Sequence, residues 1–173
     1  GYDSVVDSDR YENFSKENVE RLFADKRSSQ EELGLPLIVG EWGAFPSKGF
    51  TNDLIRHMNG ILEKYLWGSA YWEYHPGMED DENYSSLSRA YPLETAGELY
   101  SYHYNEAKKS LVMTLKATGR SRVYCPFETK SVTGFGQEGE CPIDYSVEKV
   151  GANVGYVFFR PEQTDVITVN IEG

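Results

Sequence analysis

The stretch LPLIVGEWGAF, Leu35 to Phe45, decides the fold prediction because an apolar segment runs directly into a glutamate and a tryptophan. The run from Leu37 to Val39 is typical of a parallel strand that is covered on both faces. Pro36 precedes this run, and a proline is accepted at the first residue of a strand but not in its middle. We therefore predict a buried strand that ends close to Glu41.

Two helices and a second strand are predicted around this strand. The segment from Ser15 to Gly34 begins with a capping serine, carries apolar residues at helical spacing and ends at a glycine. Thr51 is predicted to cap a second helix. The apolar residues of that helix form one stripe: Leu54, Ile55, Met58, Ile61, Leu62, Tyr65 and Leu66. The segment WGSAYWEYH, Trp67 to His75, is predicted as the second strand.

Strands that alternate with helices indicate a parallel sheet, because a crossover helix is the usual way to return to the same edge. Two parallel strands with exposed edges would be a poor fold by themselves. We therefore expect an α/β fold in which residues 1–86 are the C-terminal portion of an eight-stranded TIM barrel, (β/α)8, and form an incomplete catalytic domain.

A different pattern begins near Leu87 and marks the predicted domain boundary. The segment GELYSYHYNEAKKSLVMTLKA alternates on both sides of NEAKK and indicates a hairpin. The segments RSRVYCPF, VGYVFFRP and DVITVNIEG indicate further strands. A small antiparallel β-sandwich over residues 87–173 accounts for all of them.

Composition excludes several classes of partner. The 28 Asp and Glu residues against 17 Lys and Arg residues give a formal net charge of -11, which opposes binding to nucleic acid. No apolar run approaches the roughly 20 residues that a transmembrane helix needs, and no signal peptide opens the sequence. Because Gly1 stands where a methionine is usual, we expect a processed chain or a fragment. The compartment, secreted or cytoplasmic, stays open.

Cysteines and histidines give no sign of a metal or cofactor. The spacing of Cys125 and Cys141 is compatible with a disulfide across a hairpin or between adjacent strands, and equally with two free buried thiols. His57, His75 and His103 lack the spacing and the cysteine partners of a metal site. We therefore predict no catalytic metal and no cofactor.

Glu41 is the candidate catalytic residue because barrel enzymes place their chemistry at the carboxyl ends of the strands. Strict alternation would put it in one row with Leu37 and Val39, facing the barrel interior. Trp72 and Tyr74 in the next strand would then lie beside a carboxylate, an arrangement suited to holding a sugar ring. The alternatives are that Glu41 forms a structural ion pair and that Trp72 belongs to the core.

These segments resemble glycoside hydrolase family 5, and within it the endoglycoceramidase-like and glucosylceramidase-like branch. PLIVGEWGAF resembles the seventh barrel strand of that branch with its nucleophile, and GSAYWEYHPG resembles the eighth strand with its aromatic residue. GYDSVVDSDRY, at the start of the chain, is similar to the segment after the sixth strand, and YPLETAG to the start of the C-terminal sandwich. The resemblance spans almost the whole chain.

The resemblance implies a retaining glycosidase that cleaves a β-glycosidic bond by double displacement. Glu41 would be the nucleophile, Trp72 would face the reacting sugar, and Tyr2 would donate a hydrogen bond to Glu41. The substrate would be a β-linked glycoside or a glycolipid, which leaves room for peripheral contact with a membrane. The family's acid/base glutamate lies on its fourth strand, which has no counterpart in this sequence. We therefore expect this chain alone to be inactive.

A rival prediction makes the second half a lectin-like carbohydrate-binding module without catalysis. Tyr100, Tyr102 and Tyr104 occupy alternate positions of one predicted strand, where they would form a platform for a sugar. Tyrosines in such a row more often face a core or a neighbouring domain. Neither prediction fixes the oligomeric state.

Overall fold

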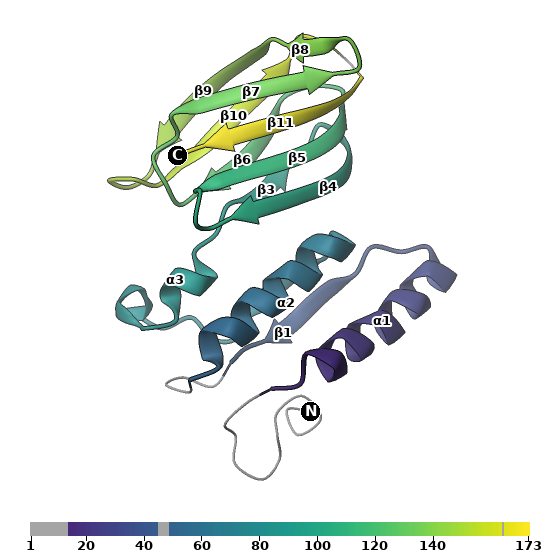
Figure 1. Ribbon diagram of the computed structural model, residues 1–173, viewed down its shortest axis with the longest axis vertical. Coiled ribbons are helices and arrows are strands. Elements are labelled where there is room, and N and C mark those ends of the chain that lie inside the picture. Colours follow the sequence, from purple (N-terminus) through teal and green to yellow (C-terminus); the bar gives the residue numbers. More distant parts are fainter. Residues whose placement is uncertain (1–13, 45–48, 164) are drawn as a thin grey trace. The chain divides into compact units, whose positions relative to one another are not determined.

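The computed structural model describes residues 14–44, 49–163 and 165–173 of the chain. It divides into two compact units, Gly1–Leu87 and Ser88–Gly173. The described helices and the strands β1 and β2 belong to the first unit, and strands β3 to β11 belong to the second (Figure 1). The mixed α/β content with antiparallel sheets in the second half agrees with the predicted fold class at this level.

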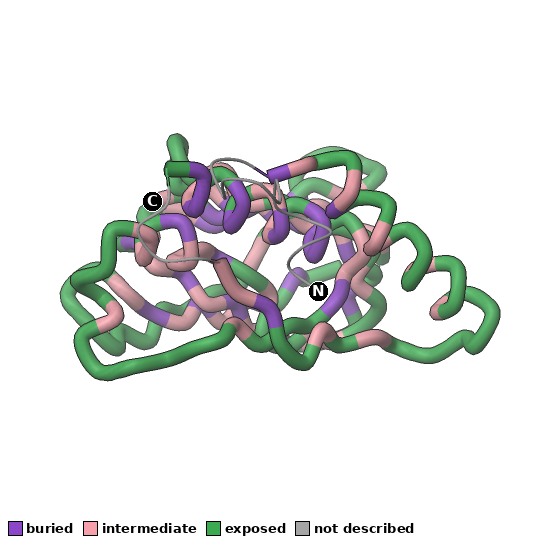
Figure 2. Tube along the Cα trace, turned by 90° about the horizontal axis from the view of Figure 1, so that it is seen from below, coloured by how far each residue is buried: buried purple, intermediate pink, exposed green. Residues whose placement is uncertain are grey.

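The first unit begins with helix α1, Lys16–Leu33, bounded by the two residues that the sequence predicted. The Ser15 hydroxyl accepts a hydrogen bond from the Asn18 backbone N–H at 3.2 Å. Gly34 closes the helix with a φ of 63°, a left-handed conformation that glycine adopts without steric cost. Most of the helix is exposed, and Val19 is its one fully buried residue. Figure 2 colours the chain by burial.

Strand β1, Ile38–Trp42, precedes helix α2, Thr51–Tyr65, which supplies most of the core of this unit. The predicted cap was wrong, because Phe50 occupies the N-cap position without a side-chain hydrogen bond and Thr51 is already helical. The predicted apolar stripe is confirmed except at its end, where Leu66 leaves the helix in a left-handed conformation with φ 55°. Its buried members are Leu54, Ile55, Met58, Ile61 and Leu62.

Strand β2, Gly68–Tyr71, pairs with β1 in parallel, so the predicted order of helix, strand, helix and strand is confirmed. The strand is shorter than predicted. It is followed by a 3-10 turn η2, Met78–Asp80, and a short helix α3, Tyr84–Leu87. The described part of the unit contains these two strands of sheet, and a closed barrel around them stays a prediction.

The pairing of β1 with β2 contains one extra residue in β1. Val39 pairs with Ser69 and Trp42 pairs with Tyr71, so three steps along β1 match two steps along β2. This β-bulge breaks the strict alternation on which the prediction for Glu41 depended. Val39 and Trp42 both pack on the helix side, where Leu37 also packs. The predicted row of Leu37, Val39 and Glu41 is therefore wrong.

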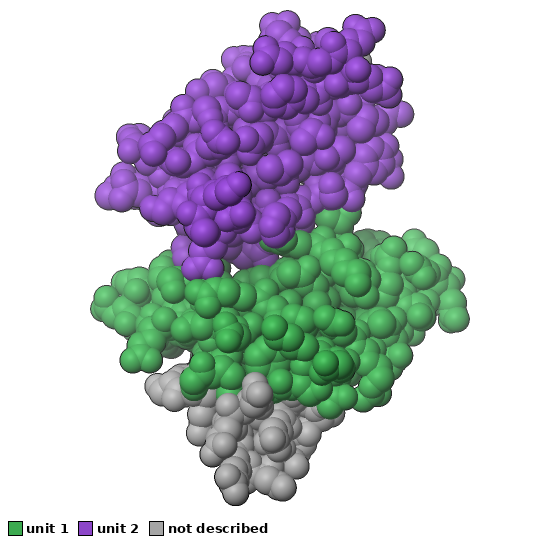
Figure 3. All heavy atoms as spheres, in the orientation of Figure 1, with its two compact units in different colours: residues 1–87 green, residues 88–173 purple. Residues whose placement is uncertain are grey.

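The second unit contains two antiparallel sheets (purple in Figure 3). One has the order β3-β6-β10-β9, formed by Tyr91–Glu94, Ser121–Cys125, Gly155–Pro161 and Ile143–Lys149. The other has the order β4-β5-β11-β7-β8, formed by Gly97–Asn105, Ser110–Ala117, Val166–Glu172, Ser131–Gly136 and Gly139–Cys141. The predicted hairpin is β4 with β5, and the other predicted strands are β6, β10 and β11.

One core contains residues from both sheets of this unit. Its fully buried side chains come from alternate positions of β5, β6, β10 and β11: Leu111, Met113, Leu115, Val123, Val157, Phe159, Ile167, Val169 and Ile171. Cys125 on β6 and Cys141 on β8 belong to the same core as free thiols, one in each sheet. Of the two alternatives left by their spacing, the structure has the free thiols.

Candidate functional site

The bulge in β1 determines the face on which Glu41 lies. Because Trp42 packs into the helix-covered core and neighbouring strand residues point to opposite faces, Glu41 belongs to the face away from the helices. Glu41 is exposed, and Ile38 on the same face is 73% exposed. That Glu41 faces the interior of a barrel stays a prediction, and the residues that share its face differ from those predicted.

Trp72 follows the end of the neighbouring strand. Tyr71 packs on the helix side, so alternation places Ala70 on the opposite side. The backbone N–H of Trp72 donates a hydrogen bond to the Trp42 carbonyl oxygen at 2.6 Å, which continues the pairing past the end of β2. The carboxyl ends of two adjacent parallel strands therefore bring the backbone of Trp72 next to that of Trp42, the residue after Glu41. Trp72 is 59% exposed, so it does not belong to the core.

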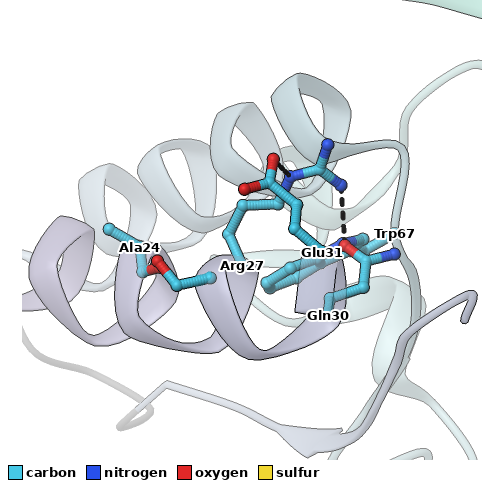
Figure 4. A network of polar contacts seen from close by, with 6 residues as sticks. Ala24, Arg27, Gln30, Glu31 and Trp67 are labelled. Carbon is cyan, nitrogen blue, oxygen red and sulfur yellow. Dashed lines mark hydrogen bonds and ion pairs between the residues drawn. The ribbon is translucent and has the colours of Figure 1, made fainter. Parts of the chain in front are cut away.

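A buried tryptophan fixes the start of β2. Trp67, which is 5% exposed, lies between the rings of Phe23 and Tyr65 at centroid distances of 5.8 and 4.9 Å. Its indole N–H donates to the Gln30 side-chain oxygen of α1 at 2.8 Å, and the same oxygen accepts from Arg27 at 2.7 Å (Figure 4). These contacts join α1 directly to the residue that precedes β2.

The two other predicted substrate-binding residues are Tyr74 and Tyr2. Tyr74 is 79% exposed in the segment after β2. The peptide bond between Trp72 and Glu73 is cis, and β2 ends before it, so strand alternation does not apply to Glu73. Tyr2 lies outside the described residues.

The segment after Tyr74 contains a contact that sequence reasoning missed. His75 Nε2 lies 2.9 Å from an Asp81 carboxylate oxygen, and His75 Nδ1 lies 3.3 Å from the Pro76 carbonyl oxygen. These two acceptors raise the pKa of His75, with the Pro76 carbonyl contributing most and Asp81 next. Asp81, which belongs to an acidic run from Glu79 to Glu82, thus has a fixed partner, and no local sequence pattern marks this contact.

The open face that carries Glu41 is separate from a surface hollow of about 290 Å³ between α1 and α2. That hollow is lined by Glu20, Arg56, His57, Gly60, Ile61, Lys64 and Tyr65, and neither Glu41 nor Trp72 lines it. Among the described residues, no group of three or more His, Cys, Asp or Glu side chains is arranged to hold a metal ion. No described helix has the length and apolarity needed to cross a bilayer.

The tyrosine platform of the rival prediction is contradicted by the packing of β4. A register shift between Leu99 and Ser101 adds a residue to this strand, so Tyr100 leaves the row and is 44% exposed. Tyr102 and Tyr104 are partly buried and pack against the core of the second unit. Tyr104 also stacks on Phe127, with an interplanar angle of 5°. Three aligned, exposed rings are therefore not present.

Solved structures of glycosidases share this fold. Endo-glycoceramidase II from Rhodococcus sp. matches 90% of this chain with a TM-score of 0.65 and 19% identity, over 37% of its own length. Sterylglucosidase 1 from Cryptococcus neoformans matches 92% of this chain with a TM-score of 0.61 and 12% identity, over 32% of its length. An endogalactoceramidase matches 96% of this chain with a TM-score of 0.64 and 17% identity, over 39% of its length.

The chain thus spans about a third to two fifths of the length of these enzymes. No family model matches the sequence, and the comparison with curated proteins found no significant match. At these identities the similarity establishes a common fold. The resemblance seen in the sequence motifs is confirmed at that level.

Proposed function

We propose that this chain is the C-terminal part of a retaining glycoside hydrolase that cleaves a β-glycosidic bond. One observation carries the proposal: β1 and β2 pair in parallel, so the carboxyl ends of two adjacent strands bring the backbones of Glu41 and Trp72 close together. The similarity of the fold to three glycosidases supports it. In this proposal residues 1–86 belong to a catalytic TIM barrel, and residues 87–173 form its trailing sandwich domain.

Glu41 is proposed as the nucleophile of a double displacement. Its carboxylate attacks the anomeric carbon and forms a covalent ester, while the bond from that carbon to the leaving oxygen breaks and a general acid protonates the oxygen. Water then attacks the same carbon, is deprotonated by that second group and releases Glu41 as a carboxylate. Such a pair requires the two carboxyl groups to be about 5 to 5.5 Å apart. We propose that the second carboxyl group belongs to sequence outside these 173 residues.

The aromatic residues beside Glu41 are proposed to hold the sugar. Trp72, anchored by its backbone to Trp42, presents a rigid apolar surface that packs against the C–H groups of a sugar ring. Tyr74 would extend this surface, and Tyr2 would donate a hydrogen bond to Glu41. The names of two similar enzymes refer to glycosylated ceramide and sterol, so we propose a lipid-linked β-glycoside as the substrate class. Such a substrate would bring the enzyme into peripheral contact with a membrane.

The proposal is tested by Glu41→Gln in the full-length protein, assayed with an aryl β-glycoside that has a good leaving group. Removing a covalent nucleophile should lower kcat by a factor on the order of 10⁴ or more. A 2-deoxy-2-fluoro glycoside should form a stable adduct with the unmodified enzyme. Mass spectrometry of the digested protein should locate the adduct on the peptide that contains Glu41.

Glu73→Gln is the matched control, because Glu73 carries the same carboxylate next to Trp72 at the end of β2. It should retain kcat within about threefold, as expected for a surface substitution. Turnover by Glu41→Gln close to that of the unmodified enzyme, or an adduct located on another peptide, would exclude Glu41 as the nucleophile.

A further inference from the structure

The loop from Pro76 to Asn83, which follows the candidate site, is closed by a single histidine. His75 precedes the loop, and its backbone carbonyl accepts a hydrogen bond from the Met78 N–H at 3.1 Å. Its side chain reaches across the 3-10 turn to Asp81, six residues later, at 2.9 Å. Both the backbone and the side chain of His75 therefore hold this loop.

The contacts of the His75 ring favour its doubly protonated form. The Pro76 carbonyl and the Asp81 carboxylate can only accept hydrogen bonds, and they lie 3.3 and 2.9 Å from the two ring nitrogens. A neutral imidazole has one N–H and can serve only one of them. Both contacts form at once only when the ring is an imidazolium, which is a donor at both nitrogens.

The far end of the loop is attached to the strand end that carries the candidate site. The side-chain amide of Asn83 donates to the Tyr71 hydroxyl at 3.5 Å, and Tyr71 is the last residue of β2. The Tyr71 ring meets the Trp42 ring edge to face at 5.1 Å. The loop is thus anchored at its start by His75 and near its far end to Tyr71, the residue that precedes Trp72.

We propose that His75 is a positioning residue for the candidate site: as an imidazolium it closes the loop from Pro76 to Asn83 and thereby holds Trp72 and Tyr74 beside Glu41. This inference rests on the proposed function for its effect on substrate. The charged groups that act on the ring are the Asp81 and Glu73 carboxylates, and both favour the cationic form. The raised pKa of His75 agrees with this assignment.

The direction of the pH dependence follows from the raised pKa. A group whose pKa is raised by its contacts stabilises them below its ordinary pKa, and this contribution is lost as the pH rises through the raised value. His75 is about half exposed, so water and salt screen the ion pair and its effect is moderate. We expect the KM for a β-glycoside to rise about two- to fivefold across this pH range, with a smaller change in kcat.

The first arm of the test does not depend on catalysis. In the full-length protein labelled with ¹⁵N-histidine, the ring nitrogens of His75 are followed by NMR as a function of pH. His75 should titrate at a higher pH in the unmodified protein than in Asp81→Asn, with both nitrogens protonated below that pH. Asp80→Asn, one residue earlier in the same turn, should leave the titration unchanged. Equal titration in the unmodified protein and in Asp81→Asn would overturn the proposal.

The second arm measures KM and kcat with an aryl β-glycoside. Asp81→Asn should raise KM by about two- to fivefold below the titration of His75, while Asp80→Asn should not. His75→Gln keeps a donor toward Asp81 but does not titrate, so it should remove the pH dependence of KM. If the activity depends on Glu41 but Asp81→Asn leaves KM unchanged, the positioning role of His75 is refuted. No β-glycosidase activity in the unmodified protein, together with the expected NMR titration, would instead refute the proposed function.

Discussion

The contact between Gln30 and Trp67 offers a quantitative test of how α1 holds the start of β2. Gln30→Met removes the acceptor at 2.8 Å from the Trp67 indole N–H, while methionine has about the same helix propensity as glutamine. Because Trp67 is 5% exposed, its N–H would be left buried without an acceptor, at a cost of about 1 to 3 kcal/mol. At that cost, the region around Trp67 should open locally about 5- to 150-fold more often in Gln30→Met than in the unmodified protein.

The assay is hydrogen exchange of the full-length protein, read by mass spectrometry on peptides from α1 and β2, because exchange reports opening element by element. In a Trp67→Phe background, which has no indole N–H, Gln30→Met should change exchange by less than about threefold. Glu32→Gln, at an exposed position of α1, should have no effect in either background. Equal effects of Gln30→Met in both backgrounds would refute the reasoning, since the hydrogen bond would then not be the source of the cost.

The second unit allows two further predictions. Gly97→Ala should lower the free energy of unfolding in urea by at least about 3 kcal/mol, because a Cβ there would lie 1.8 Å from the Lys116 carbonyl oxygen and φ is 118°. Gly139→Ala, where φ is 112° and nothing lies within 4 Å of the added Cβ, should lower it by only about 1 to 2 kcal/mol. Similar losses for the two variants would contradict the role of the Lys116 contact. Burial raises the pKa of Cys125 to about 12, so this thiol should resist iodoacetamide at pH 8 in the native protein and react once urea unfolds it. Rapid native labelling would show that Cys125 is accessible.

Local patterns predicted the elements whose signals are contained within one segment. The cap at Ser15, the glycine at Gly34 and the apolar stripe of α2 each depend on residues within a few turns of one another, and each is present. The hairpin of β4 and β5 was predicted for the same reason, because alternation on both sides of a short turn specifies a pair of strands.

Strands β3, β7, β8 and β9 were not predicted because long-range packing determines them. Gly134 in β7 is needed because a Cβ there would lie 2.6 Å from an Ile143 side-chain carbon of β9. Strand β9 is an edge strand with the polar sequence IDYSVEK, and its inward side is only partly covered. Neither feature has a local sequence signature.

The candidate site was predicted because Glu41 and Trp72 lie at the ends of two predicted strands. The residues that surround them in space were not predicted correctly. Glu41 and Trp72 were expected at adjacent strand ends, and β1 and β2 do pair in parallel. The row shared by Glu41 and the row of tyrosines were both predicted from strict alternation, and both fail where one strand holds an extra residue. Such an irregularity depends on the register with a partner strand, so one segment read alone cannot reveal it.

The bulge in β1 also has a consequence for comparing relatives of this chain. The face on which Glu41 lies depends on the number of residues between Val39 and Trp42 and on their register with β2. Removing one residue between Val39 and Glu41 would restore strict alternation, with Val39 and Trp42 toward the helices and Glu41 away from them. Relatives that are one residue shorter in this interval can therefore keep the glutamate on the same face.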